Sequence, residues 1–423
     1  MSNSQRYYIL FVLVIVNTVN FIDRQVIAIL APHIKEDLML SDTQLGVLMG
    51  LAFTLFYAFM GFPVGRLADR YPRVTVLSIM MTVWSVMTAL CGAASNFVQL
   101  LITRIFVGVG EAGAGPCSHS LISDLFRKED RPRAIGIFSL GVPFGTLFGF
   151  YFGGVLADEL GWRMTFLVVG LPGVALAILA KLTIREPVRG AMDDANVVKD
   201  EIVFLDGIKM LWGIRTFRTM AYSGALSAFC GYAVNSWTAS FFYRIHDLST
   251  ADMAPYMALS LGIGGGLGSF TGGVITSWAA KKDVRAILFF PGCAFVLFGL
   301  ALIVELWSPT LTPAYIALFI LGYTQFFLFG PFFGLIQTLA PLRARALATA
   351  FIFFIYSGIG FGLGPFYVGF LSDLFTGTYG EARALQYALS TVPFISIIAG
   401  VIIFLRLDSV KEDLAKQGVE ATG

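Results

Sequence analysis

Charged and amide side chains interrupt two long apolar stretches near the beginning of the chain. Asn20, Asp23 and Arg24 lie in the first stretch, and Arg104 and Glu111 lie in a later one. A charge at the centre of a bilayer costs about 2.5–3.5 kcal/mol on insertion scales, so such a group is expected to face a cavity or a partner. Acids and arginines held in that way suit two kinds of chemistry, the carrying of a proton and the binding of an anion.

Helical spacing predicts how deep these side chains lie. On two antiparallel helices, Asp23 and Arg104 would each lie about 12 Å from the same external end. Glu111 follows Arg104 by nearly two turns, which places it on the same helix face and about 10 Å deeper, near the midplane. We therefore expect Asp23, Arg24 and Arg104 to form a charged cluster, which is either a ligand site or a static ion pair between the two helices.

The composition predicts that these residues lie within a membrane. Of the 423 residues, 57% are hydrophobic and 13% are charged, whereas soluble proteins carry about 25% charged residues. A soluble enzyme, a secreted disulfide scaffold and a nucleic-acid-binding protein are therefore disfavoured, and the net charge of +2 has no excess that would bind a polyanion. The four cysteines show no CxxC pair and no metal-ligand spacing, so we predict no metal and no cofactor.

Apolar runs bounded by charge, glycine or proline predict twelve membrane-spanning helices. The runs cover residues 7–31, 43–67, 74–94, 97–121, 134–157, 163–182, 217–242, 255–278, 285–306, 312–336, 346–372 and 383–407. With the N-terminus in the cytoplasm, 23 lysines and arginines fall on the cytoplasmic side and four fall outside. Because cytoplasmic loops carry the excess of positive charge, we expect a multi-pass protein of the inner (plasma) membrane with both termini in the cytoplasm.

The spans divide into two halves. We predict an N-terminal six-helix bundle over residues 1–182, a cytoplasmic linker over 183–216, a C-terminal six-helix bundle over 217–407 and a cytoplasmic tail over 408–423. Within the linker, residues 200–214 are expected to form an amphipathic helix on the membrane surface.

Short strings recur in the same order in both halves. Leu40-Ser41-Asp42 precedes the second span and Leu248-Ser249-Thr250 precedes the eighth. Two repeated bundles around a central pathway are the design of many secondary transporters. The repeat therefore favours a transporter over a channel.

Two motifs connect the spans with a known superfamily. Residues 65–73 read GRLADRYPR, and residues 104–110 read RIFVGVG. These strings resemble the G-x-x-x-D-R-x-G-R signature and the fourth-helix R-x-x-x-G-x-G motif of the major facilitator superfamily, with Pro72 in place of the second glycine. The resemblance covers the whole chain and implies an all-α membrane fold of two six-helix bundles with alternating access. It also implies a cytoplasmic gate, for which the candidates are Asp69, Arg70, Arg73, Asp124 and Arg133.

A narrower resemblance is to the Spinster family of lysolipid and sphingosine-1-phosphate transporters. It rests on the strings NFIDR (20–24), GEA (110–112), ISDLF (122–126) and GWR (161–163). In that family the acid of the first helix and the arginine and glutamate of the fourth are linked to substrate and proton. The corresponding residues of this chain are Asp23, Arg104 and Glu111.

Together these observations predict a proton-linked transporter of an amphipathic, anionic, lysolipid-like molecule. Asp23 and Glu111 would couple the proton, and Arg24, Arg104 and Asn20 would bind the substrate. The alternative for Glu111 is a permanently protonated carboxyl that is hydrogen-bonded to a neighbour. We expect a monomer whose partners are the membrane, protons and a small molecule, with no nucleic acid.

The sequence is also compatible with two other functions. The nearest alternative is a proton-linked drug or organic-anion transporter of the same fold. An intramembrane enzyme is the rival from another class, although the sequence shows no catalytic His/Glu metal motif and no Ser/His pair.

Overall fold

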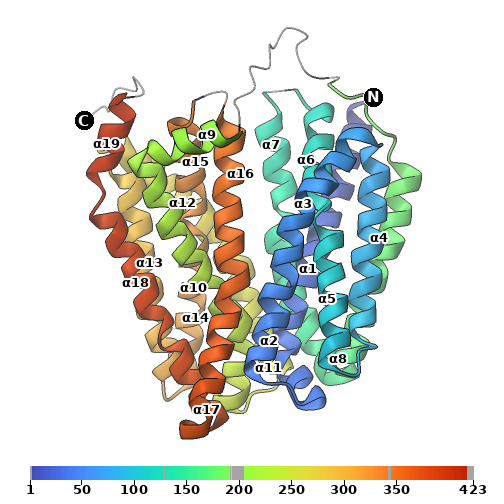
Figure 1. Ribbon diagram of the computed structural model, residues 1–423, viewed down its shortest axis with the longest axis vertical. Helices are drawn as coiled ribbons and strands as arrows, with labels where there is room; N and C mark the ends of the chain where they lie inside the picture. The colour runs from blue at the N-terminus through green and yellow to red at the C-terminus, as the bar shows by residue number, and fades with distance from the viewer. Residues whose placement is uncertain (1, 128, 191, 193–203, 342–343, 417–423) are drawn as a thin grey trace. The chain divides into compact units, whose positions relative to one another are not determined.

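Helices make up all the regular structure of the described chain. The computed structural model describes residues 2–127, 129–190, 192, 204–341 and 344–416, and within these ranges it contains no strand. The helices belong to two compact units, Met1–Val197 with Ser236–Ala258 and Val198–Asn235 with Leu259–Gly423 (Figure 1). Helices satisfy their own backbone hydrogen bonds, which is why long apolar sequences in lipid adopt them.

The first unit is built around the long helix α1 (Asn3–Leu38), which continues past its predicted end with Pro32 inside it and stops at Met39, whose φ is 50°. Its other complete helices are α2 (Asp42–Gly46), η1 (Val47–Leu51), α3 (Ala52–Arg70), α4 (Arg73–Cys91), α5 (Phe97–Glu111), α6 (Ala114–Leu125), α7 (Arg131–Ser139), α8 (Gly141–Thr183) and α11 (Thr250–Met257). Residues 236–246 of α10 (Arg215–His246) also belong to this unit.

The second unit begins with α9 (Phe204–Gly213) and residues 215–235 of α10. It continues with α12 (Gly265–Ala280), α13 (Ala286–Trp307), α14 (Leu311–Phe327), α15 (Phe329–Leu339), α16 (Arg345–Tyr356), η4 (Ser357–Leu363), α17 (Gly364–Leu389), α18 (Val392–Phe404) and α19 (Asp408–Lys416). The short element η2 (Ala258–Gly264) leads from one unit into the other.

The helices agree with the predicted membrane spans. Nine segments of the described chain are long and apolar enough to cross a bilayer. Two of these segments contain a glycine with a positive φ, Gly161 (78°) in α8 and Gly380 (75°) in α17, at which one helix ends and another begins. The 32-residue helix α10 is also long enough to cross. The predicted all-α membrane fold is confirmed, and the helices are consistent with twelve spans.

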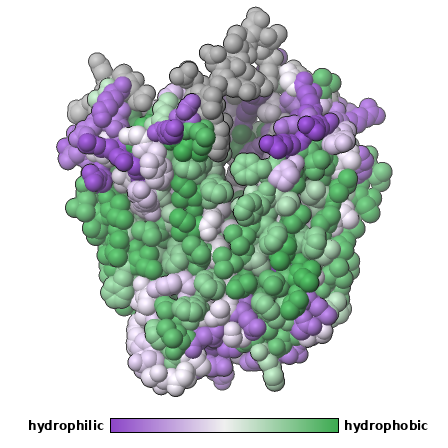
Figure 2. All heavy atoms as spheres, in the orientation of Figure 1, coloured by the Kyte–Doolittle hydropathy of each residue, from purple (hydrophilic) through white to green (hydrophobic). Residues whose placement is uncertain are grey.

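The surface of each unit carries a broad apolar zone. Figure 2 shows hydrophobic side chains over the middle of the helices and hydrophilic side chains gathered toward their ends. Large side chains are among the exposed ones, such as Phe59 on α3 and Trp278 on α12. Exposed apolar area on this scale is unfavourable in water and favourable in a bilayer.

The linker and the tail each contribute a helix. Part of the predicted amphipathic helix is present as α9, while residues 200–203 lie outside the described residues. The polar tail forms the helix α19, whose Val410 and Leu414 are buried. The predicted domain boundaries stay a prediction, because the units divide the chain within α10 at Ser236 instead of at the linker alone.

Candidate functional site

Glycines on α8 bring α1 into close contact and so orient the charged face of α1. A Cβ atom added at Gly145 would lie 2.5 Å from the Cβ of Phe21, and one at Gly149 would lie 3.0 Å from the Cβ of Gln25. The first distance is shorter than packed carbon atoms tolerate, and the second is tighter than most Cβ contacts, so a larger residue at either position would push the helices apart. With this face fixed against α8, Asp23 and Arg24 turn toward α4 and α5.

Glycines on α5 have the same effect on the partner helix. A Cβ at Gly108 would lie 2.6 Å from the carbonyl oxygen of Phe53 on α3, and a Cβ at Gly110 would lie 2.6 Å from the backbone nitrogen of Trp84 on α4. The close packing places Glu111, the last residue of α5, in the interior of the unit, where it is fully buried.

A buried ion pair between Arg24 and Glu111 connects α1 with α5. The Nε of Arg24 donates to Oε2 of Glu111 at 2.6 Å. The guanidinium also lies over three aromatic rings, with its central carbon 5.1 Å from the ring centre of Phe21, 5.0 Å from Phe53 and 4.8 Å from Tyr57. The rings exclude water and attract the cation, which strengthens the pair.

This pairing differs from the arrangement that the helical spacing predicts. Arg24 reaches Glu111, whereas the spacing grouped Arg24 with Asp23 and Arg104 and placed Glu111 deeper. Successive residues on a helix point about 100° apart, so Asp23 faces α4 instead, where its Oδ2 accepts a hydrogen bond from Thr88 at 3.3 Å. Among the described residues, Asp23 and Arg104 form no ion pair with each other.

Several buried polar atoms of this cluster lack partners in the described part of the chain. They are Nδ2 of Asn20, Oδ1 of Asp23, Nε and Nη1 of Arg104 and Oε1 of Glu111. Most buried polar atoms in proteins are hydrogen-bonded, and the exceptions call for a ligand, a water molecule or a chemical role. All five residues of the predicted proton and substrate site thus lie in the first unit, and they combine opposite charges with free hydrogen-bonding capacity.

A second charged cluster forms where the linker meets α4 and α6. Arg73 is buried and pairs with Asp124 and with Glu186, whose Oε1 lies 2.9 Å from the Nε of Arg73. The two carboxylate oxygens of Glu186 also accept the backbone N–H groups of Arg73 and Val74 at 3.0 and 2.9 Å. An acid at a helix N-terminus accepts hydrogen bonds from the free N–H groups there and interacts favourably with the helix dipole. Glu186 therefore fastens the linker to α4.

The predicted gate residues Asp69, Arg70 and Arg133 differ from Arg73 and Asp124 in their side-chain contacts. Arg189 donates to the backbone carbonyls of Ala68, Asp69 and Tyr71, so the linker also holds the end of α3. The side chains of Asp69, Arg70 and Arg133 are exposed and form no ion pair with a described residue. Glu186 and Arg189 are not among the predicted gate residues, although both charges lie within two residues of Pro187, shortly after α8 ends at Thr183.

A third cluster lies at the opposite ends of the helices of the first unit. Asp42, at the start of α2, is fully buried and accepts hydrogen bonds from Lys35 at 2.9 Å and from both terminal nitrogens of Arg244 at 2.7 Å. Close by, Asp158 accepts the hydroxyl of Thr250 and the backbone N–H of Ala251. Sequence analysis noted Leu40-Ser41-Asp42 and Leu248-Ser249-Thr250 only as a repeat, and the structure shows that both begin helices with a serine cap.

The chain is similar to known transport proteins over most of its length. The sequence profile of the Major Facilitator Superfamily matches residues 13–365. The chain is 30% identical over 410 residues to an MFS-type efflux pump of Mycolicibacterium smegmatis, covering 96% of this chain and 94% of that protein. It is 26% identical to a hexuronate transporter of Bacillus subtilis (94% and 95% covered) and 27% identical to the sphingosine-1-phosphate transporter SPNS2 of Danio rerio (91% and 81% covered).

One solved structure that is similar to this chain is that of a bacterial homolog of the human lysosomal transporter Spinster, in an inward-facing and unoccupied conformation. The TM-score is 0.89 at 29% sequence identity, over 98% of this chain and 99% of that chain. The predicted resemblance to the Spinster family is confirmed.

Proposed function

The chain belongs to the major facilitator superfamily, and from that premise we propose that it is a proton-linked transporter of an amphipathic, anionic, lysolipid-like molecule. The observation that carries the proposal is the buried Arg24–Glu111 pair, at 2.6 Å, surrounded by polar atoms without partners. A purely structural ion pair would be expected to have its remaining lone pairs and protons satisfied. The unsatisfied atoms therefore support a site that exchanges partners.

Competition for Arg24 gives a mechanism of coupling. An anionic group that approaches Arg24 competes with Glu111 for the same guanidinium. Once Glu111 loses that partner, the buried carboxylate is costly and neutralises by taking up a proton. Departure of the anion lets the ion pair form again and releases the proton. Asp23 is fully buried and, among the described residues, accepts a hydrogen bond only from Thr88, so it is the second candidate carrier.

The surroundings of Arg24 favour an amphipathic ligand. Its side chain is 14% exposed, and its guanidinium lies against Phe21, Phe53 and Tyr57. A phosphate would bind to Arg24 or Arg104, because a guanidinium can hold two phosphate oxygens at once. The adjoining rings offer apolar contact to the rest of the molecule. The named substrate of SPNS2, sphingosine-1-phosphate, has this combination of anionic head and apolar chain.

Alternating access requires contacts that break in one state and form in the other. We assign that role to the buried Asp42 cluster with Lys35 and Arg244 on the external side and to the predicted gate on the cytoplasmic side. In the gate, Arg73 and Asp124 pair directly, and Asp69, Arg70 and Arg133 are the groups whose exposed side chains are free to change partners. The inner membrane, the cytoplasmic termini and the monomeric state belong to this proposal.

The second candidate is a proton-linked drug or organic-anion transporter. The similarity to an efflux pump and to a hexuronate transporter favours it, and the same charged residues would serve it. The two candidates differ in the ligand that competes with Glu111, and a ligand panel separates them.

The test is uptake into proteoliposomes with and without an imposed pH gradient. The panel consists of a labelled lysophospholipid, a sphingosine-1-phosphate analogue, a hexuronate and a cationic dye. We expect saturable, gradient-dependent uptake of the phosphate-bearing lipids, and loss of the gradient dependence in Glu111→Gln. The matched control is Glu305→Gln on α13, which alters a buried glutamate outside the site.

Three results would decide against the proposal. Uptake of the hexuronate or the dye alone would favour the second candidate. Gradient-driven accumulation by Glu111→Gln equal to that of the parent would exclude Glu111 as the carrier and leave Asp23. Chemical conversion of a panel molecule would indicate an enzyme.

A further inference from the structure

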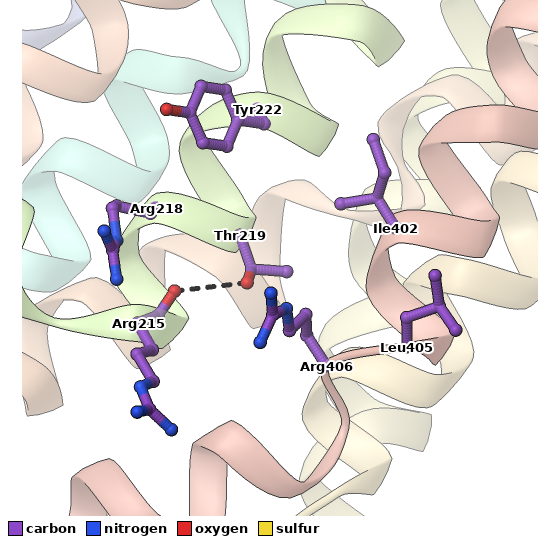
Figure 3. Close-up of a pocket in the computed structure, with 7 residues that line it drawn as sticks. All are labelled: Arg215, Arg218, Thr219, Tyr222, Ile402, Leu405 and Arg406. Carbon is purple, nitrogen blue, oxygen red and sulfur yellow. Dashed lines mark hydrogen bonds between the residues drawn. The ribbon is translucent and has the colours of Figure 1, made fainter.

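A cavity of about 640 Å³ opens where α10 begins and α18 ends, and it lies entirely within the second unit (Figure 3). Its size falls within the range of about 300–1,000 Å³ that is typical of ligand sites. The residues that line it are Arg215, Arg218, Thr219, Tyr222, Ile402, Leu405 and Arg406. None of them belongs to the proposed transport site.

The described residues that line the cavity include three arginines and no acid. Arg215 contacts Glu412 of α19 at 3.2 Å, but both side chains are more than half exposed, so this pair is weak and screened. Arg218 and Arg406 form no ion pair with any described residue. Figure 3 shows the three arginines on one side of the opening, with Tyr222 and Ile402 toward the other. Unpaired arginines that share one cavity attract an anion with several oxygens.

The walls of the cavity are held in place by neighbouring helices. The backbone N–H of Thr216 donates to Asp413 of α19 at 2.8 Å, and the hydroxyl of Thr216 donates to that of Ser409 at 3.1 Å. On the other side, the ring of Tyr222 packs edge-on against Trp212 of α9, with ring centres 5.6 Å apart. The arginines therefore project from an ordered frame in which α9 and α19 support the first turns of α10.

Apolar surface adjoins the basic part of the cavity. Leu405 is 77% exposed and Tyr222 is 52% exposed. Exposed apolar side chains at the end of a spanning helix meet the acyl region of the bilayer, while the arginines beside them meet the headgroups. The cavity thus joins a region suited to phosphate with a region suited to hydrocarbon, in the order in which a phospholipid presents them.

We propose that this cavity binds the headgroup of an anionic phospholipid of the surrounding membrane. Its phosphate groups lie between Arg218 and Arg406, and its acyl chains run along Ile402 and Leu405. Basic pockets between spanning helices on the cytoplasmic side recognise such headgroups, and this end of α10 carries the linker that we expect in the cytoplasm. A free phosphate would use the arginines but would gain nothing from the adjoining apolar surface.

The test measures lipid binding by the full chain in detergent micelles. Phosphatidylglycerol and phosphatidylcholine with the same acyl chains are titrated, and bound lipid is counted by native mass spectrometry. We expect the parent to bind phosphatidylglycerol more tightly. Each arginine near an anionic lipid surface strengthens attachment about fivefold, so the double variant Arg218→Ala/Arg406→Ala should bind it about 25-fold more weakly.

The control removes the same kind of charge outside the cavity. Lys281 follows α12, is exposed and does not line the cavity, and Lys281→Ala should leave phosphatidylglycerol binding unchanged. The variant Arg218→Lys/Arg406→Lys keeps both charges and removes the guanidinium forks. It should weaken binding severalfold, and it provides the comparison if the alanine variant does not fold.

Several outcomes would overturn the proposal. Equal affinity of the parent for the two lipids would show that no anionic headgroup is recognised. Equal losses in Lys281→Ala and in the double alanine variant would indicate a general effect of charge. Displacement of phosphatidylglycerol by inorganic phosphate at equal concentration would indicate a site for free anions. Unchanged lipid binding in both double variants would place the lipid elsewhere.

Discussion

Replacing Arg24 by glutamine should destabilise the protein more than replacing its partner. In Arg24→Gln, Glu111 stays fully buried without its ion-pair partner, so its carboxyl group must either keep an uncompensated charge or take up a proton, and both are costly at neutral pH. For this reason, removal of one member of a buried ion pair costs about 3–5 kcal/mol. The small exposure of the two side chains, 14% and 0%, means that solvent screening reduces this figure little.

The opposite substitution leaves the charge of Arg24 with its other contacts intact. In Glu111→Gln, the amide oxygen can still accept from the Nε of Arg24, and the guanidinium keeps its contacts with Phe21, Phe53 and Tyr57. A desolvated cation–π contact contributes about 2 kcal/mol. We therefore expect a loss of about 1.5–3 kcal/mol, the range for a hydrogen bond to a charged group.

A double-mutant cycle tests this asymmetry. The free energy of unfolding is measured for the parent, both single variants and Arg24→Gln/Glu111→Gln in the same detergent and at the same pH. We expect the double variant to be more stable than Arg24→Gln alone, with a coupling energy of at least about 2 kcal/mol. Equal costs for the two single variants, together with an additive double variant, would refute the buried-pair reasoning.

Three further predictions concern packing, the external cluster and the anion. Gly145→Ala should destabilise the protein by about 1–3 kcal/mol and reduce transport, because its Cβ would lie 2.5 Å from that of Phe21. The control Gly115→Ala has open space around it, so it should be neutral or slightly stabilising in thermal unfolding. Asp42→Asn removes the charge that holds Lys35 and Arg244, so cysteines placed on the external side should react faster, and unchanged labelling would argue against a gating role. Arg104→Lys keeps the charge but loses the planar fork, so direct binding of a phosphate-bearing ligand should weaken about tenfold, whereas parental affinity would remove Arg104 from the ligand site.

The sequence determined the fold class and the list of candidate site residues. Long apolar runs must become helices in a bilayer, because no other open structure satisfies their backbone groups. The predicted run 285–306 corresponds to α13 within one residue at each end. The repeated strings at residues 40 and 248 correspond to two equivalent serine caps, since a cap depends on residues only three positions apart. Charges within apolar runs are rare, which is why Asp23, Arg24, Arg104 and Glu111 could be identified from the sequence.

Only the tertiary structure decided which of these residues meet. Arg24 pairs with Glu111 because glycines on α8 and α5 set the distance and rotation of helices far apart in the chain. Glu186 reaches Arg73, and α19 reaches the start of α10, across separations of 113 and 197 residues. Spacing along one helix fixes which side chains share a face, but it carries no information about the neighbour that this face contacts. Partner choice depends on how the side chains of both helices pack, and that is a property of the assembled fold.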